Sequence, residues 1–328
     1  MTRKPKEGRF TEVYRESDEK DSGRNVLVSR LRTAAIVLAI VFGFIYLDVK
    51  APLAGVPGLW MLPIYLVLCL GTAREATSIV RSAWQLPVFW SPTVVLLSAA
   101  LPAVPELLRA LGAADMLDPA WTGAQGRLAI VCIGNWILAS YLGVRALAVY
   151  QDRQEAIGWL TSLGLLMYIS VATSLWWILR QVGDPDAAMF NVVGIAMVTK
   201  IADSGAYFAG KNLGRTPLAP VLSPKKTWEG LLGGWIVASL AAVVYFSWLG
   251  NSNPPQSSSW SIVGALLLGT TLTWFGLLGD LIESMMKRSG RVKDSGGTLA
   301  GLGGIWDVTD SLIPAGVVGL IAVVLGWI

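Results

Sequence analysis

The stretch Gly279–Ser311, GDLIESMMKRSGRVKDSGGTLAGLGGIWDVTDS, lies between two long apolar runs. It brings basic residues, carboxylates and a series of glycines to the edge of segments that are apolar enough for lipid. One Asp, Lys or Arg in the hydrocarbon costs on the order of 2.5–3.5 kcal/mol on insertion scales, so such charges usually face a cavity, a partner or an ion. The stretch therefore predicts a membrane protein whose functional site lies at this edge.

The composition of the whole chain agrees with this interpretation. Of 328 residues, 54% are hydrophobic and 15% are charged, which is unlike a soluble domain of this size. A helix needs roughly 17–25 residues to cross the hydrocarbon. We predict an all-α polytopic integral membrane protein with about nine transmembrane helices, near 33–49, 58–73, 87–104, 128–149, 157–179, 187–202, 229–249, 261–282 and 304–328.

The basic residues indicate how the chain is oriented. With a cytoplasmic amino terminus, nine crossings put every Lys and Arg on the inner side except Lys50, Arg109, Arg127 and Arg180. This is the asymmetry that the positive-inside rule describes. The net charge of +4 then reflects orientation and attraction to anionic lipid head groups of the bilayer. We therefore expect no nucleic-acid partner.

The chain divides into three regions. Residues 1–32 mix charges with little apolar content and are predicted to form a disordered cytoplasmic tail. Residues 33–186 form an N-terminal transmembrane scaffold, and residues 187–328 form a C-terminal transmembrane catalytic region. Cys69 and Cys132 lie in apolar spans without metal-ligand spacing, so we assign both to packing.

A first polar motif runs from Lys200 to Gly214, KIADSGAYFAGKNLG. If the helix continues inward, Asp203, Tyr207 and Lys211 follow one another at four-residue intervals and share one face. The alternative is an ordinary helix end with a solvated Lys–Asp pair.

A second motif, LSPKKTWEG, runs from Leu222 to Gly230. Backbone amides at a helix start, beside Lys225, Lys226 and Thr227, would make an anion site suited to a polyphosphate. Ser223 and Glu229 can instead be capping groups.

The opening stretch supplies the third motif. Asp280, Ser284 and Lys287 are spaced to share one helical face, and Asp307, Asp310 and Ser311 lie within one turn. Glycines between Gly296 and Gly304 let the backbone approach a ligand or another helix closely. Carboxylate oxygens beside a cationic strip favour a Mg²⁺–phosphate site over a zinc site.

The chain contains no histidine. This excludes an imidazole base, a Ser-His-Asp triad and a His-ligated zinc ion. The remaining chemistry of carboxylate, lysine and metal suits phosphoryl or nucleotidyl transfer.

These motifs resemble the phosphatidate cytidylyltransferases, or CDP-diacylglycerol synthases. ADSGAYFAGKNLG, LAPVLSPKKTWEG and GDLIESMMKRSGRVKDSGG follow the family's order and spacing between about Thr199 and Ser311. The last of them contains the family core S-x-x-K-R-x4-K-D, which is present as Ser284, Lys287, Arg288, Lys293 and Asp294.

The family pattern continues as P-G-H-G-G-x-x-D-R-x-D, and here the chain departs from it. Ala300, Leu302 and Val308 stand where Pro, His and Arg are usual, whereas the glycines, Asp307 and Asp310 are kept. Either the missing His and Arg are accessory, or the substrate or the activity has changed.

The resemblance implies an enzyme that joins CTP to phosphatidic acid, releasing pyrophosphate and CDP-diacylglycerol for phospholipid synthesis. It further implies a requirement for Mg²⁺, one ion or two. We expect a multi-pass protein of the cell inner (plasma) membrane, with its active site facing the cytoplasm, and a homodimer.

The resemblance also suggests residue roles. Asp280 and Asp307 would ligate the metal, with Asp310 as a further ligand or support, and Lys226 and Lys287 would act beside them in catalysis. The expected substrate-binding residues are Ser223, Lys225, Lys226, Thr227, Glu229, Asp203, Lys211, Ser284, Lys287, Arg288, Lys293 and Asp294.

Two other functions remain open. One is a CTP-dependent transferase or kinase acting on a polyprenol or another lipid phosphate. The other is a membrane transporter, since charges inside a membrane also mark ion pathways. The gathering of polar residues on one side and the lack of an inverted repeat disfavour the transporter.

Overall fold

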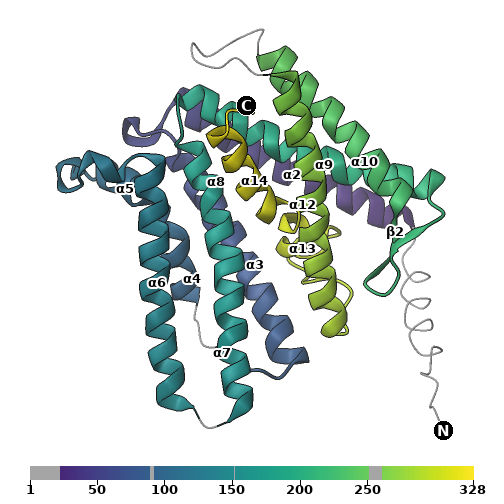
Figure 1. The fold of residues 1–328 in the computed structure, drawn as a ribbon, viewed down its shortest axis with the longest axis horizontal. Coiled ribbons are helices and arrows are strands. Elements are labelled where there is room, and N and C mark those ends of the chain that lie inside the picture. The colour runs from purple at the N-terminus through teal and green to yellow at the C-terminus, as the bar shows by residue number, and fades with distance from the viewer. Residues whose placement is uncertain (1–22, 89–91, 151, 251–260) are drawn as a thin grey trace.

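The computed structural model describes residues 23–328 except 89–91, 151 and 251–260 (Figure 1). The described chain is largely helical. Its helices are α2 (Gly23–Lys50), α3 (Leu62–Ala83), α4 (Pro92–Ala100), α5 (Val104–Ala110), α6 (Ala124–Val149), α7 (Arg153–Leu166), α8 (Ala172–Arg180), α9 (Pro185–Leu213), α10 (Trp228–Ala242), α12 (Ile262–Ser289), α13 (Ile305–Thr309) and α14 (Leu312–Val324). π-helical turns at Met167–Val171 and Val243–Leu249 join α7 to α8 and lengthen α10.

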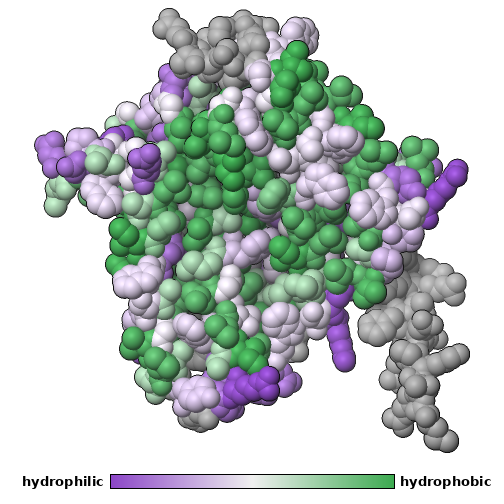
Figure 2. Space-filling view, viewed as in Figure 1, coloured by the Kyte–Doolittle hydropathy of each residue, from purple (hydrophilic) through white to green (hydrophobic). Residues whose placement is uncertain are grey.

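Nine helical segments within the described residues are long and apolar enough to cross a bilayer. Each overlaps one of the nine predicted spans, so the prediction of a polytopic helical fold is confirmed. Figure 2 shows hydrophobic side chains over the middle of one face and hydrophilic ones gathered toward its edges. This is the distribution expected of a protein surrounded by lipid.

Several helices continue beyond their predicted ends. α3 runs to Ala83, α9 to Leu213 and α12 to Ser289, whereas the apolar runs end near residues 73, 202 and 282. The first helix begins at Gly23, so the predicted boundary of the tail at residue 32 falls inside it, and residues 1–22 lie outside the described part of the chain. Hydropathy marks where lipid contact ends, but the backbone hydrogen bonds continue into polar sequence.

The two largest of four hydrophobic clusters in the described residues join the two halves of the chain. One buries Ala76 and Val80 of α3 against Trp306 of α13 and Met286 of α12. The other packs α9, α10, α12 and α14 around a centre that includes Leu268. α12 contributes to both cores, so the scaffold and the C-terminal helices form one packed unit.

α9 and α10 lie against each other over most of their length (Figure 1). Glycine allows this close approach, because a Cβ atom on Gly234 would lie 2.7 Å from the Ala202 carbonyl oxygen. Between these helices the chain forms one feature that an all-α prediction omits. Strands β1 (Pro217–Ala219) and β2 (Ser223–Thr227) pair as an antiparallel hairpin at the helix ends.

Two buried ion pairs lie at the ends of the spans that are away from the β1–β2 hairpin. Arg180 binds Asp48 at 2.5 Å, and Arg127 binds both carboxylate oxygens of Glu106 at 2.6 Å. All four side chains are nearly inaccessible. Two of the arginines predicted to lie on the outer side are therefore neutralised by carboxylates within the protein, which lowers the cost of burying them.

Candidate active site

The three motifs from distant parts of the sequence line one pocket of about 650 Å³. Its walls come from the end of α9, from the β1–β2 hairpin with the start of α10, and from α12. Its polar lining consists of Asp203, Tyr207, Lys211, Lys225, Lys226, Thr227, Thr273 and Asp280. Three cations, hydroxyl groups and two carboxylates therefore face a common space.

The pocket wall from α9 is the predicted polar stripe. Because α9 continues to Leu213, Asp203, Tyr207 and Lys211 lie on one helical face and all three reach the pocket. The Lys211 ammonium group lies 6.0 Å from the centre of the Tyr207 ring. The extended-helix interpretation therefore holds for this motif.

The second motif has two functions. Thr227 caps α10 by accepting a hydrogen bond from the Gly230 amide at 3.1 Å, and it also lines the pocket. Glu229 accepts hydrogen bonds from the amides of Arg215 and Thr216. The carboxylate of Glu229 thus closes the loop before β1 and is not among the groups that line the pocket.

Two lysines pair with carboxylates in the pocket and next to it. Lys226 forms an ion pair with Asp280. Lys200 donates to the Ser311 hydroxyl at 2.8 Å and to Asp203 at 3.3 Å, and its ammonium lies 3.9 Å from Asp310. The sequence places Lys200 at the end of an apolar run, and only the fold shows that it bridges two motifs.

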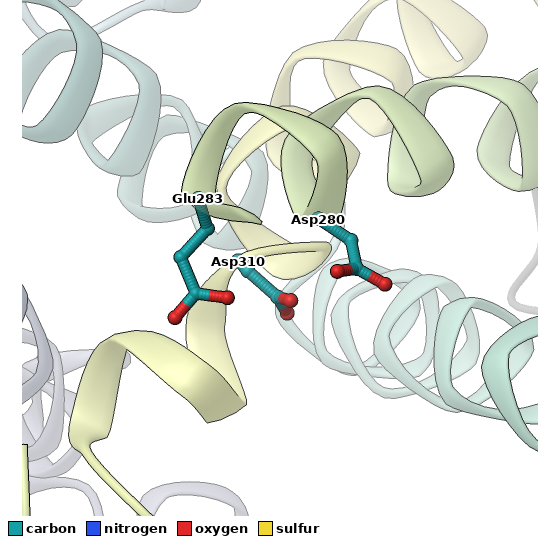
Figure 3. Close-up of side chains that lie close together, drawn as sticks. All are labelled: Asp280, Glu283 and Asp310. Atoms are coloured by element: carbon teal, nitrogen blue, oxygen red, sulfur yellow. The ribbon is translucent and has the colours of Figure 1, made fainter. Parts of the chain in front are cut away.

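Asp280, Glu283 and Asp310 bring one carboxylate oxygen each to within 4.8 Å of one another. Figure 3 shows two of these side chains extending from α12 and the third from the segment that follows α13. Glu283 Oε1 is buried without a hydrogen-bond partner in the described structure. A hard cation would satisfy this oxygen, and three carboxylates are the ligand type that Mg²⁺ prefers. The residues present therefore fit a magnesium ion.

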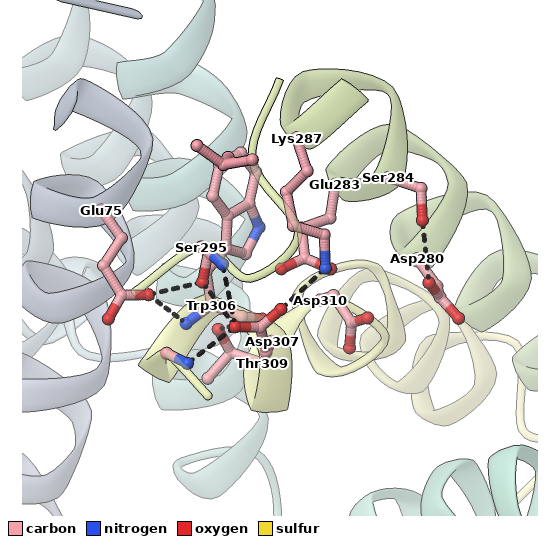
Figure 4. A network of polar contacts seen from close by, with 12 residues as sticks. Glu75, Asp280, Glu283, Ser284, Lys287, Ser295, Trp306, Asp307, Thr309 and Asp310 are labelled. Atoms are coloured by element: carbon pink, nitrogen blue, oxygen red, sulfur yellow. Dashed lines mark hydrogen bonds and ion pairs between the residues drawn. The ribbon is translucent and has the colours of Figure 1, made fainter. Parts of the chain in front are cut away.

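Asp307 is a neighbour of this carboxylate cluster but is not one of its three members. Its carboxylate accepts hydrogen bonds from Lys287 at 2.7 Å, from the Gly304 amide at 2.7 Å and from the Ser295 amide at 3.0 Å (Figure 4). Lys287 also donates to Glu283 at 2.7 Å. Lys287 therefore joins Asp307 to the carboxylate cluster, while Glu283 occupies the place in that cluster that the sequence suggested for Asp307.

The other predicted residues surround this centre. The Ser284 hydroxyl is buried 3.5 Å from Asp280. Arg288 donates to the Leu222 carbonyl at 3.2 Å and so ties the hairpin to α12. Ser223 begins β2 outside the pocket lining, and Lys293 and Asp294 are exposed in the loop after α12.

A residue of the N-terminal scaffold, Glu75 of α3, holds the loop between α12 and α13. Its buried carboxylate accepts hydrogen bonds from the Ile305 amide at 3.0 Å, the Trp306 amide at 2.9 Å and the Thr298 hydroxyl at 2.8 Å. The Ser295 hydroxyl lies 2.8 Å from Glu75 and 3.0 Å from Asp307 (Figure 4). The first half of the chain therefore orients the loop before α13 and the start of that helix, which the sequence motifs do not indicate.

Glycine is required where this loop meets Glu75. A Cβ atom added at Gly296 would lie 2.6 Å from Glu75 Oε1, and one added at Gly304 would collide with Glu75 Oε2. Gly297 has no heavy atom within 4 Å of such a Cβ. Gly296 and Gly304 thus leave space for the Glu75 carboxylate, whereas Gly297 does not contact it.

We expect Glu75→Ala to destabilise the protein by about 2–6 kcal/mol, because it leaves the two buried amides of Ile305 and Trp306 without an acceptor, at about 1–3 kcal/mol each. Unfolding of the detergent-solubilised protein measures the loss. Asp115→Asn, a change at an exposed carboxylate, serves as the control. Equal stability of the two variants would contradict this role of Glu75.

Gly304→Ala should destabilise the protein by about 1–3 kcal/mol through overpacking, whereas Gly297→Ala should have little effect. The same unfolding measurement compares them. In a Glu75→Ala background the cost of Gly304→Ala should shrink in part, since the colliding carboxylate is gone while the Ser295 hydroxyl, which the added Cβ atom would also approach too closely, remains. An unchanged cost in that background would show that another contact is responsible.

Comparison with known proteins places the chain among relatives with a shared name. The model of the cytidylyltransferase family matches residues 28–325. Phosphatidate cytidylyltransferase of Haemophilus influenzae is 39% identical over 132 residues, which cover 40% of this chain and 45% of that protein. The Bacillus subtilis enzyme is 45% identical over 111 residues, covering 34% of this chain and 39% of that protein.

The matches to these two relatives span less than half of their length. A longer match joins the chain to the phosphatidate cytidylyltransferase of Staphylococcus aureus, which is 30% identical over 213 residues, or 64% of this chain and 76% of that protein. Since the family model runs from the first span to the last, this chain belongs to the cytidylyltransferase family.

Proposed function

We propose that this protein transfers CMP from CTP to phosphatidic acid, yielding CDP-diacylglycerol and pyrophosphate for phospholipid synthesis. The observation that carries the proposal is the joining of three polar motifs in one pocket, beside a carboxylate cluster suited to Mg²⁺. The relatives named phosphatidate cytidylyltransferase support the identity of both substrates.

The reaction is a displacement at phosphorus. An oxygen of the lipid phosphate attacks the α-phosphorus of CTP, the bond from that phosphorus to the α–β bridging oxygen breaks, and pyrophosphate leaves with the electron pair. A phosphate monoester is largely ionised near neutral pH, since its second pKa is about 6. The attacking group therefore scarcely needs a base, and catalysis depends on position and on charge neutralisation.

The pocket contains the groups that this displacement requires. Lys211, Lys225 and Lys226 supply positive charge for a triphosphate. Lys226 pairs with Asp280, and incoming phosphates would compete for this lysine and leave Asp280 available as a ligand. Binding of the nucleotide and formation of the metal site would in this way depend on each other.

Asp280, Glu283 and Asp310 would hold one Mg²⁺ ion or two. Bound Mg²⁺ supplies charge neutralisation at phosphoryl oxygens. Asp307 and Lys287 would position this ligand set, because Lys287 bridges Asp307 and Glu283. Lys293 and Arg288 would lie nearer the lipid phosphate or the leaving pyrophosphate.

The proposed site would face the cytoplasm of the cell inner membrane. The distribution of Lys and Arg supports this orientation, because the loops beside the pocket carry most of the basic residues of the second half. CTP is a water-soluble anion and the lipid substrate stays in the bilayer. A pocket at the membrane edge is suited to bring the two together.

We expect purified protein to convert CTP labelled in its cytosine and phosphatidic acid into labelled CDP-diacylglycerol and pyrophosphate. Asp280→Asn should lower kcat by at least about 100-fold, the scale seen when one preorganised electrostatic group is removed. Asp115→Asn is the matched control. Transfer of the γ-phosphate of CTP to a lipid would instead support a kinase, and full activity of Asp280→Asn would refute the assignment of this carboxylate.

Binding of Mn²⁺ in place of Mg²⁺, followed by electron paramagnetic resonance without substrates, tests the ligand set. Glu283→Gln should weaken binding at least about tenfold, whereas Asp307→Asn should weaken it less, because Asp307 contacts the cluster through Lys287. The reverse order would make Asp307 the ligand and Glu283 the positioning group.

A further inference from the structure

Two arginines of α3 lie away from the pocket just described. Arg74 and Arg81 are seven residues apart, two helical turns, so both lie on one face of α3. Both side chains are exposed. Neither forms a hydrogen bond or an ion pair with any other residue in the described ranges. Within the described part of the chain these two positive charges therefore have no counter-charge.

The arginines lie in a groove of about 760 Å³. One stripe of α3 forms its floor, from Leu70 at the apolar end through Arg74 and Ser78 to Arg81, and Pro92 at the start of α4 adds a wall. The groove thus changes along its length from apolar to cationic. Such a gradient matches a molecule with a hydrocarbon chain at one end and an anion at the other.

Arg74 lies just beyond the apolar run of α3, which ends near residue 73. Arg81 is seven residues further on in the polar end of the helix and therefore about 10 Å along the helix axis at 1.5 Å per residue. Both arginines are thus placed at the edge of the hydrocarbon, while Leu70 and Val67 belong to the apolar run. The side chain can extend toward Arg81 and the head-group layer, where the abundant anions are lipid phosphates.

The groove is separate from the pocket. No residue lines both sites, and α3 contributes nothing to the pocket lining. Glu75, the residue after Arg74, lies about 100° further around α3 and points into the loop before α13, while Ala76 and Val80 pack into the core.

We propose that this groove binds an anionic phospholipid, with Arg74 and Arg81 on the head-group phosphate. The Ser78 hydroxyl adds a hydrogen-bond donor, and the acyl chain runs over Leu70 and the exposed Val67. Arginine is well suited to this function because its guanidinium group binds phosphate oxygens in pairs. The site is additional to the proposed transferase activity and does not depend on it.

The test places a bimane fluorophore on Val67→Cys, which lies two helical turns from Arg74 toward the apolar end of the groove. Cys132, an exposed free cysteine, is replaced by Ala so that it is not labelled. The full chain is placed in nanodiscs with increasing fractions of brominated phosphatidylglycerol or brominated phosphatidylcholine. Quenching reports acyl chains next to residue 67. Each arginine near a membrane surface contributes about a fivefold preference for anionic lipid, so phosphatidylglycerol should half-saturate quenching at a fraction at least about fivefold lower.

Arg74→Gln with Arg81→Gln should remove this preference, and Arg74→Lys with Arg81→Lys should keep part of it. The fluorophore on Val144→Cys, a lipid-exposed position of α6, should show no preference. Equal quenching of the Val67→Cys protein by both lipids would overturn the proposal, even if the glutamine variant failed to fold. A preference that survives the glutamine changes, or appears equally at Val144→Cys, would also overturn it.

Discussion

The buried carboxylate of Glu75 is the contact on which the arrangement of the site depends. It binds amides at the start of α13 and hydroxyls of the preceding loop, and the glycines at 296 and 304 leave space for it. α13 is short, so it lacks the internal hydrogen bonds that would stabilise it alone. Contact with the scaffold holds it, and with it Asp307 and Asp310, against α12.

The second constraint is the pairing of charge at membrane depth. Lys200, Lys226 and Lys287 alternate in space with carboxylates from α9, α12 and the segments around α13. Each lysine pairs with a carboxylate from an element other than its own, so charge neutrality and tertiary structure support each other.

Much of this could be predicted from the sequence. Apolar runs long enough to cross a bilayer located the nine spans, and the four-residue spacing of Asp203, Tyr207 and Lys211 correctly placed them on one face. Helix ends were less predictable, because hydropathy falls where hydrogen bonding continues. Glu75 carried no signal, since one carboxylate in an apolar segment does not reveal a partner more than two hundred residues away.

By itself, the sequence determined the membrane environment, the helical class, the residue types of the site and the exclusion of histidine chemistry. These are local properties that composition, spacing and the cost of exposing polar backbone to lipid dictate. Only the tertiary structure decided that Glu283 joins Asp280 and Asp310 while Asp307 binds Lys287 and backbone amides. The choice among nearby carboxylates depends on helix rotation and on the path of a glycine-rich loop, which long-range packing sets and residue spacing does not encode.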